Sequence, residues 1–138
     1  MEPLSPDYLS GIATQLGSVS AFFGGFAATV LALFLTLGKK SRGALIAAQA
    51  SAVAAVSFIV AVTASTALIA KTHPHATRTT TVLSTGTMRD LLVLSFSIGM
   101  IALLVAIAAS GWSHSKAMGW TTLLFSAVAI VLVSLLIA

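Results

Sequence analysis

The sequence predicts an all-α fold, an integral membrane four-helix bundle whose helices run up-down-up-down. The first reason is composition: 58% of the 138 residues are hydrophobic and 7% are charged, whereas soluble domains carry roughly 25% charged residues. The second reason is placement, because the charged residues lie outside four long apolar stretches. Each stretch is long enough to cross a hydrocarbon core of about 30 Å as a helix. We therefore expect residues 1–138 to form one multi-pass transmembrane domain.

The first membrane span is expected at about 14–37. Ser5 and Pro6 form a helix-start pattern, because serine is a favoured N-cap and proline fits the first helical position. A helix from Pro6 to Leu37 would be about 48 Å long, which is more than the hydrocarbon core requires. Its first turns are therefore expected among the lipid headgroups.

The second span is expected over 44–70. It follows a short polar turn that contains Lys39, Lys40 and Arg42. The main loop, 71–87, is rich in threonine and separates the first two spans from the last two.

The third span is expected over 88–111, where Thr87 and Asp90 have the spacing of a capping box. A short turn with Lys116 then leads to the fourth span, 118–138. Because the turns within the first and second pairs of spans are short, each pair is expected to form an antiparallel hairpin.

Basic residues near the span ends predict the orientation, since Lys and Arg favour the cytoplasmic side. The determining charges are Lys39, Lys40, Arg42 and Lys116, in the two short turns. They place these turns in the cytoplasm and both termini on the non-cytoplasmic side. Because three basic residues lie on the other side, the bias is small and dual topology remains open.

The small residues of the first span share one face. On a helical wheel they fall within an arc of about 140°, with bulky apolar residues opposite. Small faces let helix backbones approach closely, which is how helices associate in lipid. The face is expected to pack against the second span, to form an interface with another subunit or to line a pore. Its members are Gly17, Ser20, Ala21, Gly24, Gly25, Ala28 and Ala32.

The second span offers a matching small surface in its first half. It consists of Ala44, Ala47, Ala48, Ser51, Ala52 and Ala55. Three polar side chains in the spans, Thr29, Thr36 and Gln49, are expected to form interhelical hydrogen bonds or to line a pore.

No pattern in the chain indicates catalysis, a cofactor or a metal site. There is no cysteine, and the serines of the spans have no nearby base to activate them. The basic residues are spread over loops, so nucleic acid is not an expected partner. The expected partners are the lipid bilayer and either further copies of this chain or other membrane subunits.

Two functions remain open. The first is a helix-packing or accessory subunit of a homo- or hetero-oligomeric membrane complex. The alternative is an oligomeric channel or transporter with an uncharged path lined by Gly, Ser and Thr.

Overall fold

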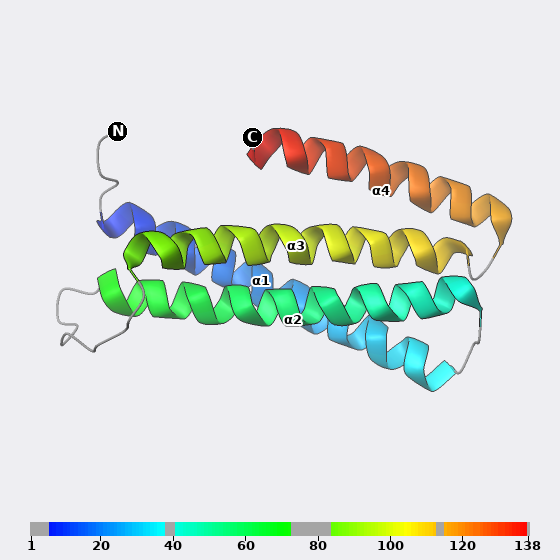
Figure 1. Cartoon of the computed structure of the whole chain (residues 1–138), viewed down its shortest axis with the longest axis horizontal. Coiled ribbons are helices and arrows are strands. Elements are labelled where there is room, and N and C mark those ends of the chain that lie inside the picture. Colours follow the sequence, from blue (N-terminus) through cyan, green and yellow to red (C-terminus); the bar gives the residue numbers. More distant parts are fainter. Residues whose placement is uncertain (1–5, 38–40, 73–83, 113–114, 138) are drawn as a thin grey trace.

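The computed structural model describes residues 6–37, 41–72, 84–112 and 115–137, and these form four helices. The helices are α1 (Pro6–Leu37), α2 (Arg42–Thr72), α3 (Thr85–Trp112) and α4 (Lys116–Ile137). Successive helices run in opposite directions (Figure 1). The prediction of an all-α chain of four helices is confirmed. The Ser5 cap and the lysines Lys39 and Lys40 lie outside the described residues.

Serine side chains cap the N-termini of three helices. The Oγ atoms of Ser41, Ser84 and Ser115 each accept a hydrogen bond from the backbone N–H three residues further on, at 3.2 Å. Such a cap satisfies one of the N–H groups that the first helical turn leaves without an acceptor. Each of these helices therefore begins at the residue that follows a serine.

The capping box predicted at Thr87 and Asp90 is wrong. Helix α3 begins earlier, at Thr85, because Ser84 provides the cap. Asp90 instead forms an ion pair with Arg89, in which its Oδ1 lies 3.3 Å from Nη2 of Arg89. Both side chains are exposed.

Helices α2 and α3 lie side by side along the middle of the molecule (Figure 1). Helix α1 packs on α2 and barely contacts α3. Among the described residues, α4 packs on α3 alone, and its C-terminal end diverges from α3. Contacts between helices thus follow the order of the chain.

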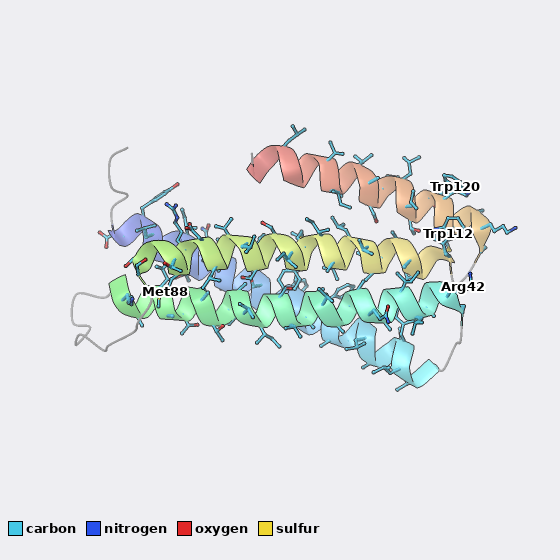
Figure 2. The ribbon with its side chains drawn as sticks, viewed as in Figure 1. Arg42, Met88, Trp112 and Trp120 are labelled. Atoms are coloured by element: carbon cyan, nitrogen blue, oxygen red, sulfur yellow. The ribbon has the colours of Figure 1, made fainter. Side chains whose placement is uncertain are left out.

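Small side chains occupy most of the buried positions, and many large apolar ones point outward (Figure 2). The buried positions of α2 recur every three or four residues, which is the spacing of a helix seam. They are Ala44, Ala47, Ser51, Ala54, Phe58, Ala61, Ser65 and Leu68. Phe22 and Phe125, in contrast, are 72% and 75% exposed. This distribution is typical of helices that pack in lipid and is the reverse of a water-soluble core.

Three helices are long and apolar enough to cross a membrane. The qualifying stretches are Asp7–Thr36, Arg42–Lys71 and Thr85–Trp112. The apolar stretch found in α4, Lys116–Val131, is shorter. The sequence predicts a fourth span over 118–138, and the structure places a helix of 22 residues there.

Labelling of single cysteines should report the number of crossings, because the chain has no cysteine of its own. Ser41→Cys and Ala117→Cys should react with an impermeant maleimide from one side of the membrane. Gly86→Cys and a cysteine appended after Ala138 should react from the other side. An appended cysteine that is labelled on the same side as Ala117→Cys would show that α4 does not cross.

Candidate helix-packing site

Phe58 is the largest fully buried side chain in the described part of the chain. Its side chain extends from α2 toward both α1 and α3. Its ring centroid lies 5.7 Å from that of Phe23 on α1 and 6.0 Å from that of Phe96 on α3. These separations fall within the range of favourable aromatic pairs. Phe58 therefore joins the three helices in a single cluster.

Two glycines make room for Phe58. A Cβ atom added at Gly24 of α1 would lie 3.2 Å from the Cβ of Phe58. A Cβ added at Gly99 of α3 would lie 3.0 to 3.1 Å from atoms of the Phe58 ring. Both distances are tighter than ordinary van der Waals contact, so the absence of a side chain at these positions permits the packing.

The predicted small face of α1 divides into an inner and an outer part. Ser20 is fully buried, and Gly17 and Gly24 are half-buried against α2. At Gly17 an added Cβ would lie 2.5 Å from the Oγ of Ser65. The remaining members are exposed, and these are Ala21, Gly25, Ala28 and Ala32. We call these four residues the outer small face.

A groove runs between α1 and α2 beside the outer small face. Its volume is about 390 Å³, and its walls include Ala21, Gly25 and Ala28 from α1 and Ile59 from α2. A second groove of about 290 Å³ shares Ala21 with the first. No atom lies within 4 Å of a Cβ added at Gly25. This side of α1 is therefore open to another helix.

Two buried serines have no hydrogen-bond partner among the described residues. They are Ser20 and Ser51, and both Oγ atoms are inaccessible. Ser18 and Thr29 instead donate to the carbonyl four residues earlier in their own helix. A buried hydroxyl without a partner costs about 1–3 kcal/mol. Ser20 lines the groove beside the outer small face.

The three predicted polar contacts lie on the outside of the protomer. The Thr29 hydroxyl donates to the carbonyl of Gly25 at 2.9 Å. The Thr36 hydroxyl donates to carbonyls of its own helix at 3.0 Å. Gln49 is exposed and has no hydrogen bond to any described residue. In the part of the chain that the structure describes, these side chains make no hydrogen bond between helices.

The described charges predicted to determine topology lie at one end of the molecule. Arg42 begins α2 and Lys116 begins α4, and both are exposed. Figure 2 shows Arg42 at the same end as Trp112 and Trp120, and Met88 at the opposite end. No group of three potential metal ligands occurs in the part of the chain that the structure describes.

The hairpin of α3 and α4 also depends on glycines. A Cβ added at Gly119 would lie 2.8 to 3.0 Å from the ring of Trp112, and one at Gly111 would collide with Thr122. The Thr122 hydroxyl of α4 donates a hydrogen bond to the carbonyl of Ala108 on α3 at 3.3 Å. Helices α3 and α4 therefore approach each other most closely near the start of α4.

Phe58 and Gly99 are not among the packing residues that the sequence predicts. The sequence nevertheless contains a signal for both residues. Phe58 is the aromatic residue of α2, and it falls in the series of small residues that recur every three or four positions along that helix. Gly99 is the glycine in the middle of α3. A large residue in a small seam requires a matching gap on the neighbouring helix, and Gly99 provides it.

Alanine at two glycines should have opposite effects on stability. Gly99→Ala forces the Phe58 ring to move and should lower the free energy of unfolding by about 1–3 kcal/mol. Gly25→Ala meets no neighbour and should raise it by up to about 1 kcal/mol, because alanine favours helix. Thermal unfolding of the monomer in detergent, followed by circular dichroism, measures both. Equal effects at the two sites would contradict the packing of Phe58 on Gly99.

Comparison with known proteins gave no match. No family model matches the chain, and neither a curated protein sequence nor a solved structure matches it.

Proposed function

We propose that the chain is a small four-span integral membrane protein that acts as a helix-packing or accessory subunit of a homo- or hetero-oligomeric membrane complex. The observation that carries the proposal is the outer small face of α1, which no other part of the described protomer covers. Both termini lie on the non-cytoplasmic side in this proposal.

The membrane location is supported by the outward distribution of large apolar side chains. Exposed Phe, Leu, Val and Ile residues occur on all four helices, and soluble monomers rarely expose apolar surface of this extent. Helix α4, with 22 residues, is about 33 Å long. That length matches a hydrocarbon core of about 30 Å, so we include α4 as the fourth span.

The outer small face supports the oligomer. Hydrophobic attraction between helices is weak in lipid, and close backbone contact at small residues takes its place. Ala21, Gly25, Ala28 and Ala32 follow the spacing that places residues on one side of a helix.

The channel is the second candidate. The observation that favours it is the position of Thr29 and Thr36, which lie on the same exposed side of α1 as Gly25 and Ala32. If several copies met through this side, hydroxyl groups would face the centre of the assembly. We rank it second because both hydroxyls are already bonded to carbonyls of their own helix.

Disulfide cross-linking should identify the partner of α1. Ala28→Cys lies on the outer small face, and Val56→Cys lies on the exposed side of α2 as a matched control. We expect Ala28→Cys to form a cross-linked species in oxidised membranes and Val56→Cys to remain monomeric. Twice the protomer mass would identify a homo-oligomer, and another mass would identify a foreign subunit. Equal cross-linking at both sites would contradict a specific interface.

A second substitution tests whether the contact is close. Gly25→Leu should strongly reduce the cross-linking of Ala28→Cys, because leucine separates the helices. It should not lower the thermal stability of the detergent monomer, since a side chain at Gly25 meets no neighbour there and leucine favours helix over glycine. Loss of the folded monomer would instead show that Gly25 packs internally.

Ion flux separates the two candidates. Liposomes that contain the purified protein should be no more permeable to common cations and anions than empty liposomes. A current that changes with Thr29→Val or Gln49→Leu would reverse the ranking and favour the channel. Ile59→Leu, on the same groove but without a polar group, serves as the control substitution.

A further inference from the structure

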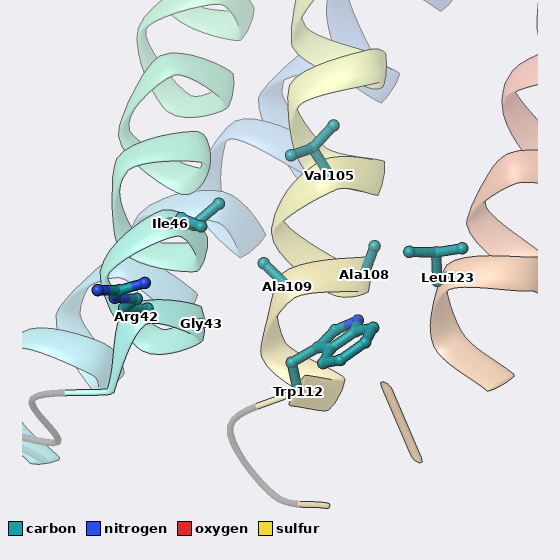
Figure 3. A pocket seen from close by; sticks show the side chains of 8 residues that line it. All are labelled: Arg42, Gly43, Ile46, Val105, Ala108, Ala109, Trp112 and Leu123. Atoms are coloured by element: carbon teal, nitrogen blue, oxygen red, sulfur yellow. The ribbon is translucent and has the colours of Figure 1, made fainter. Parts of the chain in front are cut away.

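A third groove, which is apolar, lies at the end of the molecule where Arg42 begins α2 and Lys116 begins α4. It has a volume of about 390 Å³ and lies between α2, α3 and α4 (Figure 3). It forms because α4 packs on α3 and makes no close contact with α2. Its walls include Ile46 of α2, Val105 and Ala109 of α3, and Leu123 of α4. Nothing in this part of the groove offers a polar group to a ligand.

The groove ends at a cation and an indole. Arg42, in the first turn of α2, and Trp112, in the last turn of α3, both line it. No ion pair joins Arg42 to a carboxylate in the described ranges. Tryptophan is favoured at the level of lipid headgroups, so the two residues mark the membrane surface.

The charges of the described residues differ between the two ends. At the end opposite the groove, Asp7 and Asp90 balance Lys71 and Arg89. At the end with the groove, Arg42 and Lys116 have no acidic residue beside them in the helices. The groove therefore combines an apolar wall with a positive end.

We propose that this groove binds an anionic phospholipid, with one acyl chain along Ile46, Val105 and Leu123 and the phosphate at Arg42. Such a molecule carries a negative charge that complements Arg42 and an apolar tail that complements the groove. In a bilayer its headgroup lies at the surface and its acyl chain lies below, as Arg42 and the apolar wall do. Basic pockets between membrane helices are suited to anionic headgroups. The N–H groups of the first turn of α2 add to the attraction for a phosphate.

The proposal rests on the membrane location argued above, but it does not depend on the outer small face. The groove and the outer small face lie on different sides of α2, because the groove is shared with α3 and α4. Lipid binding and subunit assembly can therefore be tested separately.

Quenching of Trp112 fluorescence by brominated phospholipids provides the test. Trp120→Phe leaves Trp112 as the sole tryptophan of the chain. The protein is reconstituted with mixtures of phosphatidylcholine and phosphatidylglycerol, with bromine on the acyl chains of one lipid at a time. We expect brominated phosphatidylglycerol to quench Trp112 more strongly at equal mole fraction, and the effect to saturate.

Two pairs of variants connect the effect to the groove. Arg42→Gln should reduce the preference for phosphatidylglycerol about fivefold, the factor expected for one basic residue at a membrane surface. Arg89→Gln, at the other end, should leave it unchanged. Ala109→Phe fills the groove and should reduce quenching by the anionic lipid, whereas Ala117→Phe, exposed on α4, should not.

Three outcomes would overturn the proposal. Equal quenching by the two lipids would show that the groove has no preference for an anionic headgroup. Complete loss of the preference for phosphatidylglycerol on addition of millimolar inorganic phosphate would show that a free anion occupies the Arg42 end of the groove. Absence of quenching by either lipid would show that no acyl chain occupies the groove beside Trp112, whereas the membrane location is tested separately by the cysteine labelling.

Discussion

The packing of Phe58 between Gly24 and Gly99 is the contact on which the rest of the arrangement depends. The seam of α2 otherwise consists mostly of alanine and serine, whose surfaces allow neighbouring helices to slide. The Cβ of Phe58 lies against Gly24 and its ring lies against Gly99, so this one side chain fixes the positions of α1 and α3 along α2. Van der Waals contact of this kind replaces the hydrophobic drive that lipid lacks. The groove beside the outer small face and the groove that ends at Arg42 and Trp112 follow from the resulting positions of the helices.

The two grooves differ in chemistry, although both have volumes of about 390 Å³. The groove beside α1 is lined by small residues and lies away from charged side chains, so its walls favour the backbone of another helix. The groove bounded by α4 ends at Arg42 and Trp112 and favours an amphipathic molecule. The chain thus presents two surfaces of different chemistry, one for each of the two neighbours proposed above.

The sequence predicts the four helices because charged residues interrupt long apolar stretches. It also predicts which residues of α1 are small, but it does not predict which of them pack inside the protomer. Gly24 and Gly25 are equally small and differ by about 100° on the helix. The deciding residue is Phe58, on another helix, and its contact with Gly24 appears only when the helices are assembled. The starts of α2, α3 and α4 depend on single serine caps, which are local signals that apolar stretches do not reveal.

Both hydrophobic core clusters consist of residues from α1, α2 and α3, and the last of these residues along the chain is Leu103. Every member of the described core has therefore been synthesised before the first residue of α4. Because chains begin to fold from the N-terminal side during synthesis, the three-helix unit can assemble while α4 is still being made. Helix α4 then joins a completed surface through Gly111 and Gly119. Its late arrival leaves a period in which a lipid molecule can enter beside α3 before α4 closes one wall.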